Sequence, residues 1–254
     1  MKPIAWYKAL SNAKARERRE SGFFIVEGKR AIDQIKSAAP RSIEEILVTE
    51  QILPEFNKYS CAVRVLPERQ FDSICVSKTP QGAAAVVRIP EKSYGNELPR
   101  QTGDRVLLLE GLQDPGNVGT LIRTAAAFDF GGVVLSNECA DPFSPKAVQA
   151  SAGAIMSVWV RRTADYLTIA EELKSRGFNL VAADIRGEPL NPAYRLPLPC
   201  VLMLGSESAG LGQKLLALAD KKIRIPMNGR MVESLNVAVA GAILMFLGSK
   251  YQRR

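Results

Sequence analysis

Residues 106–127, VLLLEGLQDPGNVGTLIRTAAA, join an apolar run to a polar, glycine-containing turn and then to a helix. The run 106–109 is short and continuous, which is typical of a strand buried on both faces of a sheet. Asn117 is predicted to cap the following helix, because asparagine is a favoured N-cap residue, and Arg123 lies two turns along that helix. The stretch therefore predicts a strand, a turn and a helix of an α/β fold.

The same arrangement recurs through the second half of the chain. Similar apolar runs alternate with helical segments, at residues 133–135, 158–160, 179–183, 201–204 and 223–226. Strands that alternate with helices predict a parallel sheet covered by helices. The last helix, near residues 234–247, is apolar nearly all round, so we expect it to be buried, between the sheet and a partner chain.

The first half has a different pattern. Helices are predicted near residues 6–20 and 29–38, and strands near 23–27, 46–48 and 63–66. Residues 89–102 contain prolines and a glycine among polar residues and show neither the helical nor the strand periodicity of apolar residues, so they suit a linker. We therefore predict a small α/β domain over residues 1–95 and a parallel-sheet domain over residues 103–254.

Composition excludes several classes of protein. The chain has 254 residues, 46% of them hydrophobic and 24% charged, which is ordinary for a globular protein. It has no histidine, which removes Ser-His-Asp catalysis and His-ligated metals, and its four cysteines form no C-x-x-C pair. No apolar run approaches a membrane span of about 18 residues, and the first 20 residues lack a signal-peptide core. We expect a cytoplasmic protein without a metal or a membrane partner.

Positive charge is concentrated at the beginning of the chain. The net charge is +8, and residues 1–30 hold eight basic against three acidic residues. Two interpretations stay open: a solvated helix face, or a surface that contacts the phosphates of a nucleic acid. The candidate RNA contacts are Arg16, Arg18, Arg19, Lys29 and Arg30.

Three polar, glycine-containing loops follow strands of the predicted parallel sheet, in the segments 110–127, 204–211 and 225–236. Open α/β sheets bind ligands at the carboxyl ends of their strands, so these loops are expected to converge on one site. Common phosphate-binding loops do not fit. Gly205 and Gly210 have Walker spacing, but Leu211 and Gly212 stand where lysine and serine or threonine are required, and no G-x-G-x-x-G follows a strand.

The three loops resemble the signature motifs of the SpoU (TrmH-like) RNA 2′-O-ribose methyltransferases, part of the SPOUT class. The matching segments are N-x-G-x-x-x-R-T at 117–124, G-x-E-x-x-G-L at 205–211, and I-P-M at 225–227 with S-L-N-V at 234–237. Residues 22–28, GFFIVEG, also resemble the start of the family's small substrate-binding domain. The resemblance implies a deep trefoil knot in the parallel-sheet domain and a homodimer packed through it.

The resemblance also implies the cofactor and the site residues. The cofactor is S-adenosylmethionine, with Leu204, Gly205, Ile225, Met227 and Leu235 as its contacts. The implied catalytic group comprises Arg123, Asn117, Glu207, Ser234 and Asn236. A guanidinium is a poor base, so the physical role of Arg123 is to hold phosphate and stabilise the forming alkoxide.

Three other residues of this group have expected roles that follow from their positions in the loops and the last helix. Glu207 is expected to pair with Arg123 or to orient Asn117. Ser234 is a candidate cap of the last helix, and Asn236 projects from the first turn of that helix. One departure from the family pattern is visible, because four residues, 230–233, separate Gly229 from Ser234 where members usually have three. We therefore expect the cofactor loop to bulge at Met231 and Val232.

The implied activity is methyl transfer to a ribose 2′-hydroxyl in structured RNA. The added N-terminal domain favours ribosomal RNA over transfer RNA, because the resemblance associates that domain with rRNA-directed members. A transfer-RNA methyltransferase is one alternative. A non-catalytic RNA-binding or ribosome-assembly factor is the other, and the presence of Arg123, Glu207 and Asn236 speaks against it.

Overall fold

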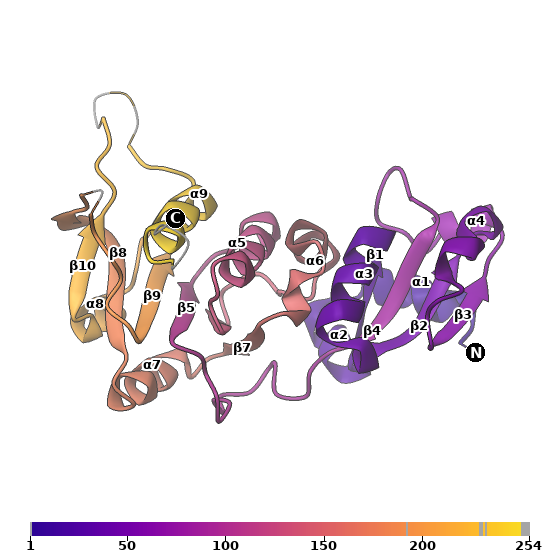
Figure 1. The fold of residues 1–254 in the computed structure, drawn as a ribbon, viewed down its shortest axis with the longest axis horizontal. Coiled ribbons are helices and arrows are strands. Elements are labelled where there is room, and N and C mark those ends of the chain that lie inside the picture. The colour runs from indigo at the N-terminus through magenta and orange to yellow at the C-terminus, as the bar shows by residue number, and fades with distance from the viewer. Residues whose placement is uncertain (1, 192, 229–230, 232, 250–254) are drawn as a thin grey trace. The chain divides into compact units, whose positions relative to one another are not determined.

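The computed structural model describes residues 2–191, 193–228, 231 and 233–249. The chain forms two compact units (Figure 1). The first unit comprises Met1–Glu91 together with Asp141–Ser157, and the second comprises Lys92–Ala140 together with Val158–Arg254. The division near residue 91 falls inside the predicted linker.

The segment Asp141–Ser157 groups differently from the sequence prediction, which placed all of residues 103–254 in one domain. Phe143 lies just before α6 (Pro145–Ser151), and its ring centroid is 5.2 Å from that of Phe24. The Asp141 carboxylate also forms a buried ion pair with Arg18. These contacts join the segment to the first unit.

A four-stranded mixed sheet forms the centre of the first unit. Its order is β1-β4-β2-β3, with β4 antiparallel to both neighbours and β2 parallel to β3. The strands are β1 (Phe23–Glu27), β2 (Ile43–Val48), β3 (Ala62–Val65) and β4 (Ala83–Arg88). The helices include α3 (Lys29–Ala38) and α4 (Glu68–Asp72). The sequence analysis missed β4, although β4 lies between β1 and β2.

The predicted first helix is two helices, α1 (Ile4–Asn12) and α2 (Ala15–Ser21). Ala13 and Lys14 have extended ψ angles of 141° and 165°, so these two residues interrupt the helix. The Glu17 carboxylate accepts the Lys14 backbone N–H at 2.6 Å, which is the reciprocal half of a capping box. A new helix therefore begins after Lys14.

The second unit confirms the predicted parallel sheet. Its six strands have the order β10-β8-β9-β5-β6-β7, and each described pair is parallel. The strands are β5 (Arg105–Glu110), β6 (Gly132–Ser136), β7 (Trp159–Thr163), β8 (Asn179–Pro189), β9 (Cys200–Gly205) and β10 (Lys221–Arg224). Each matches an apolar run identified in the sequence.

Helices bury both faces of the central strands. One core cluster packs α7 (Tyr166–Ser175) and α8 (Gln213–Leu218) against Leu108, Val201 and Met203. Leu107 and Leu202, which alternate with these residues, are also completely buried. This two-sided burial explains why the strands read as continuous apolar runs rather than alternating ones.

The last helix, α9 (Val237–Leu247), is buried on one face only within the chain. It packs closely on α5 (Pro115–Ala127), because a Cβ on Gly241 would lie 2.4 Å from Leu121 Cδ2. Val239, Ile243 and Phe246 form an exposed apolar stripe on α9, with exposures of 49%, 36% and 45%. The expectation of complete burial is thus not met by this chain alone. The trefoil knot remains a prediction from the resemblance.

Candidate active site

Three polar loops meet at the carboxyl ends of β5 and β9, as the sequence predicts. Glu110 and Gly205, the last residues of these strands, are paired in the sheet. Beyond them, Asn117 donates from Nδ2 to Glu207 Oε1 at 2.7 Å, and Asn236 donates from Nδ2 to Asn117 Oδ1 at 3.1 Å. Residues that are 90 and 119 positions apart in the chain thus form one hydrogen-bonded group.

The donors and acceptors in these hydrogen bonds are assigned by α9, which fixes the orientation of the Asn236 side-chain amide. Its Oδ1 accepts from the backbone N–H groups of Ala238 at 2.9 Å and Val239 at 3.3 Å. The Asn236 NH₂ must therefore face Asn117, whose own NH₂ then faces Glu207. A carboxylate is an acceptor, so the chain of donors ends on Glu207. Of the two roles predicted for Glu207, the structure supports orientation of Asn117.

Two helix caps differ from the predictions. Asp114, not Asn117, caps α5, and its Oδ2 accepts the Asn117 backbone N–H at 3.1 Å. The Asn117 side chain is thereby left for the interactions with Glu207 and Asn236. Asn236, not Ser234, caps α9, and Ser234 is exposed in the preceding segment. An aspartate followed by proline at the first helical position was the signal for the α5 cap.

Arg123 lies on the exposed side of α5. Within the described part of the chain, its guanidinium forms no hydrogen bond or ion pair with another side chain, Glu207 included. A guanidinium carries five N–H donors and a permanent charge. Arg123 is therefore available to bind an anionic group.

The loop after β9 is closed tightly on itself. A Cβ on Gly205 would lie 2.1 Å from the carbonyl carbon and oxygen of Gly210. Gly210 adopts a φ of +65° and donates its N–H to the Ser206 carbonyl at 2.9 Å. The two glycines thus let the backbone fold back directly after the strand, which places Glu207 at the tip of the turn.

The predicted cofactor contacts lie around this loop. Leu204 is buried, with 2% exposure, whereas Ile225, Met227 and Leu235 are half-buried. Among the described residues, no backbone hydrogen bond joins Ile225, Met227 or Leu235 to another segment. Half-buried residues whose backbone groups have no partner in the described ranges fit a ligand that is recognised through main-chain donors and acceptors, as expected for S-adenosylmethionine.

The predicted bulge in the cofactor loop falls largely outside the described residues, which omit 229, 230 and 232. Met231 is described, and it is 78% exposed. Its exposure agrees with a side chain that points away from a buried pocket.

Glu110 and Tyr166 belong to the site's framework, and the sequence analysis missed them. Glu110 Oε2 accepts the Gly212 backbone N–H at 2.6 Å, and Glu110 Oε1 accepts the Tyr166 hydroxyl at 2.7 Å. Burial and the hydrogen bond to Glu110 raise the pKa of Tyr166. Glu110 therefore ties the end of the Gly205–Leu211 loop to β5 and α7. A carboxylate directly after the apolar run 106–109 was the available signal.

The predicted RNA-contacting residues of the first unit occupy different environments. Arg16 is exposed and pairs with Glu20, whereas Lys29 is half-buried and pairs with Asp33 at 3.1 Å. Arg19 and Arg30 are exposed. Arg18 contradicts the prediction.

Arg18 is buried, and its charge is already compensated. Its Nε and one terminal nitrogen each lie 2.7 Å from Asp141 Oδ2, and both side chains are 5% exposed. Another nitrogen donates to the Ala13 carbonyl. A guanidinium enclosed in this way cannot contact RNA, so we remove Arg18 from the candidate contacts.

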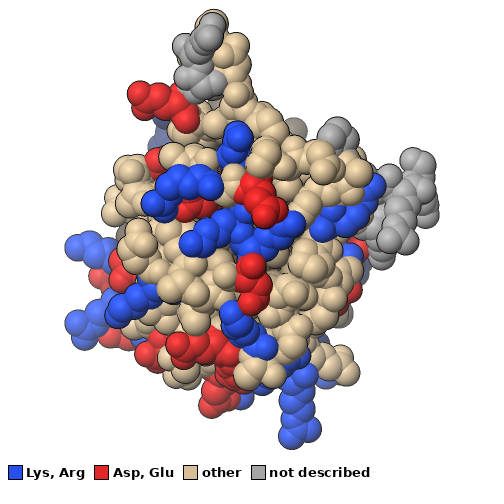
Figure 2. Space-filling model, turned by 90° about the vertical axis from the view of Figure 1, so that its left-hand side faces the viewer, with Lys and Arg blue, Asp and Glu red and all other residues tan. Residues whose placement is uncertain are grey.

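Basic residues of the second unit do not gather into one patch on the face that Figure 2 shows. Lys and Arg cross this face with Asp and Glu among them (Figure 2). Several basic residues of the second unit pair with acidic ones, as Lys221 does with Glu188 and Arg186 with Asp184. Among the described residues, no group of three or more side chains is placed to hold a metal ion. Nor is any described helix long and apolar enough to cross a membrane.

Comparisons with known proteins agree with this geometry. Residues 104–246 match the model of the SpoU rRNA Methylase family, and residues 6–85 match the MRM3-like substrate binding domain. The chain is 32% identical over 234 residues to the 23S rRNA (guanosine(2553)-2′-O)-methyltransferase RlmP of Bacillus subtilis, covering 91% of this chain and 90% of the relative.

Solved structures share the fold over nearly the whole chain. A TrmH-family protein from Porphyromonas gingivalis has a TM-score of 0.82 at 32% identity, covering 98% of this chain and 97% of that one. An AdoMet-bound rRNA methyltransferase from Sinorhizobium meliloti has a TM-score of 0.78 at 27% identity, covering 96% and 92%. The motifs, the parallel sheet and these matches together establish that the chain belongs to the SpoU rRNA methylase family.

Proposed function

We propose that the protein is an S-adenosylmethionine-dependent methyltransferase that modifies a ribose 2′-hydroxyl in ribosomal RNA. The observation that carries this proposal is the Asn117–Glu207–Asn236 group at the carboxyl end of the parallel sheet. It lies beside half-buried residues whose backbone has no hydrogen-bond partner in another segment of the described chain. Family membership supports the reaction class. The RlmP relative and the matching rRNA methylase family model support ribosomal RNA over transfer RNA as the substrate.

S-adenosylmethionine, when bound, supplies an electrophilic methyl group. The protein's task is to hold the RNA hydroxyl in line and to stabilise negative charge on its oxygen. Arg123 suits this task, because its guanidinium, which has no side-chain partner among the described residues, can bind a phosphate and the 2′-oxygen together. The Asn117–Glu207–Asn236 group holds three loops in one arrangement, so the site is ordered before RNA arrives.

Methyl incorporation tests this proposal directly. Ribosomal and transfer RNA from a strain lacking the protein would be incubated with purified protein and methyl-labelled S-adenosylmethionine. We expect label in ribosomal RNA, located at a ribose 2′-oxygen by nuclease mapping. Label confined to transfer RNA would overturn the choice of substrate. The absence of both cofactor binding and transfer would indicate a non-catalytic RNA-binding or ribosome-assembly factor.

Gly205→Ala tests where the cofactor lies. The added Cβ meets the Gly210 backbone, so the loop that carries Glu207 must shift. We expect cofactor affinity, measured by calorimetry, to fall at least about tenfold, which corresponds to about 1.4 kcal/mol. Gly95→Ala is the matched control, because its added Cβ has a nearest contact of 3.4 Å. Normal affinity in Gly205→Ala would refute this placement of the cofactor.

We also propose that two copies of the chain associate through α9. The exposed stripe of Val239, Ile243 and Phe246 is apolar and continues onto Phe128, whose ring centroid is 5.8 Å from that of Phe246. Exposed apolar surface of this kind favours protein association. Phe246→Glu should convert a dimer into a monomer, as measured by analytical sedimentation.

We propose the cytoplasm as the location of the protein, because ribosomal RNA is accessible there.

A further inference from the structure

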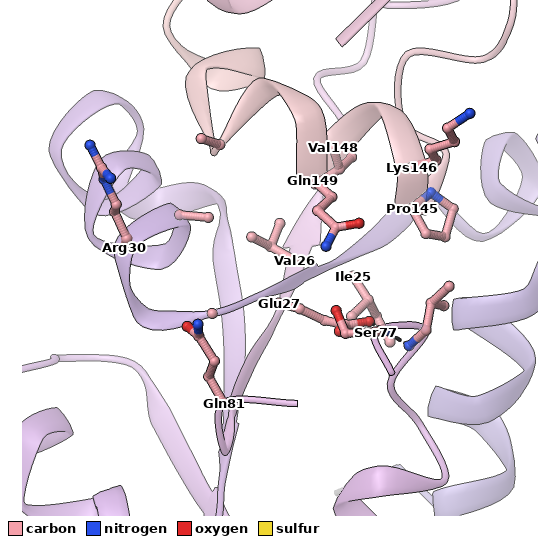
Figure 3. Close-up of a pocket in the computed structure, with 14 residues that line it drawn as sticks. Ile25, Val26, Glu27, Arg30, Ser77, Gln81, Pro145, Lys146, Val148 and Gln149 are labelled. Atoms are coloured by element: carbon pink, nitrogen blue, oxygen red, sulfur yellow. Dashed lines mark hydrogen bonds between the residues drawn. The ribbon is translucent and has the colours of Figure 1, made fainter. Parts of the chain in front are cut away.

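A cavity of about 380 Å³ lies within the first unit, and none of its lining residues belongs to the three loops of the candidate active site (Figure 3). Strand β1, the beginning of α3 and the short helix α6 contribute to its walls. Its floor is apolar and buried, with Ile25, Val26 and Val148 between 0% and 7% exposed. Its volume is within the range of about 300 to 1,000 Å³ that is typical of small-molecule sites.

Polar side chains stand at the rim of this cavity. Gln149 reaches from α6 toward β1, and the Gln81 amide lies on the opposite side of the hollow (Figure 3). Within the described ranges neither amide has a hydrogen-bond partner. Each amide offers donors and an acceptor, so the pair can form hydrogen bonds with a molecule that carries both kinds of group on its edge.

Glu27 adds an acceptor to the site without adding an unsatisfied charge. Its two carboxylate oxygens accept the backbone N–H groups of Val76 at 2.6 Å and Ser77 at 3.2 Å. A carboxylate has about four acceptor positions, so two remain for a ligand. Arg30 and Lys146 stand at the rim as exposed cations, and Arg30 has no partner among the described residues.

An apolar floor, amides and a carboxylate at the edge, and cations outside match the chemistry of a nucleotide. A base can lay its flat face on the floor and present its N–H and carbonyl groups to the amides. Its phosphates would then lie toward Arg30 and Lys146. Sequence-specific RNA recognition uses unstacked bases in this way, through contacts to the edges of the base.

We propose that this cavity binds one unstacked nucleotide of the substrate RNA, at a position distinct from the methylated ribose. The inference rests on the proposed function, because it takes RNA to be the substrate. It assigns to the first unit a base-reading role in addition to phosphate contacts. The segment Asp141–Ser157 thereby takes part in RNA recognition through Gln149 and Lys146.

Binding measurements on the full-length protein test this proposal. The double variant Gln81→Leu/Gln149→Leu retains side chains of similar volume and loses the amide hydrogen bonds. We expect its Kd for unmethylated ribosomal RNA, measured by filter binding, to rise about tenfold, as two lost hydrogen bonds imply. Gln70→Leu, an exposed change on α4, is the matched control and should alter the Kd less than about twofold.

Two further measurements sharpen the result. Arg30→Gln should flatten the dependence of log K on log salt by about 0.7 to 0.9, the value for one phosphate contact, whereas the exposed Arg41→Gln should not. A mixture of nucleoside monophosphates, added as a competitor, distinguishes a site for RNA from a site for free nucleotides. Binding of free nucleotides without any change of RNA affinity in the double variant would overturn the proposal.

The readouts separate this proposal from the proposed function. Methyl transfer and cofactor affinity test the enzyme, whereas the change of RNA affinity between variants tests the cavity. An unchanged Kd in the double variant refutes the cavity even if methyl transfer is confirmed. A raised Kd supports it even if the parent protein transfers no methyl group.

Discussion

Two arginines on two helices show how differently the same side chain is used in the two units. Arg18 on α2 is buried against Asp141, and both side chains are 5% exposed. Arg123 on α5 is exposed and has no partner among the described residues. The charge of Arg18 is compensated inside the protein, so it supports packing. The charge of Arg123 remains available for a ligand.

Removing Arg18 is expected to have the largest effect on stability. Arg18→Ala breaks the buried ion pair with Asp141, and removing one partner of such a pair typically costs about 3 to 5 kcal/mol. We expect urea unfolding to show a loss of this size. Arg16→Ala, which breaks an exposed pair with Glu20, should change the free energy of unfolding by less than about 0.5 kcal/mol. Equal effects of the two substitutions would remove the contrast between buried and exposed arginines.

Removing Arg123 should affect the reaction and leave the fold intact. Arg123→Ala is expected to lower methyl transfer about 100- to 1000-fold, since one lost donor to a developing oxyanion costs about 2.7 to 4 kcal/mol. Single-turnover transfer with saturating RNA and cofactor measures this step apart from binding. Arg123→Lys should recover little, because an ammonium cannot reproduce the planar fork.

The stability and the cofactor affinity of the Arg123→Ala variant serve as controls for its activity. The thermal midpoint and the cofactor affinity of Arg123→Ala should match those of the parent protein. Transfer at a tenth of the parental rate would show that Arg123 is not the catalytic residue. Glu207 or Asn236 would then be the next candidate.

Asn236 connects helix capping with the site, and two substitutions separate these roles. Asn236→Ala removes the cap of α9, so we expect a loss of about 0.5 to 2 kcal/mol of stability. Asn236→Asp retains an oxygen for the Ala238 and Val239 N–H groups but removes the donor to Asn117. If the hydrogen-bonded group matters, Asn236→Asp should fold normally and still transfer methyl groups more slowly. Normal transfer by this variant would reduce Asn236 to a cap.

The smallest expected effect concerns the exposed arginines of α2. Arg16→Gln/Arg19→Gln should weaken RNA binding and flatten its salt dependence by up to about 1.4 to 1.8 in the log–log slope, for two phosphate contacts. Cofactor affinity should stay unchanged. An unaltered slope would support the other interpretation of this surface, a solvated helix face.

The sequence by itself determined the parallel sheet and the position of the candidate site. Strands buried on both faces leave continuous apolar runs, and ligand loops follow their carboxyl ends, so both features are local in the sequence. The motifs then placed Asn117, Glu207 and Asn236 together before any contact was known. By contrast, the sequence did not indicate β4 as a strand, since its first three residues are alanines, which have low β-propensity.

Only the tertiary structure decided which polar side chains are free and which are occupied. The sequence presents Arg16, Arg18 and Arg19 as one basic cluster, yet Arg18 finds Asp141, 123 residues further along the chain. It likewise cannot show that Glu110 holds Gly212, across 102 residues. Burial and pairing depend on contacts between distant segments, whereas periodicity and capping reflect neighbours a few residues apart. The chemistry of a charged residue is therefore settled by the fold that surrounds it.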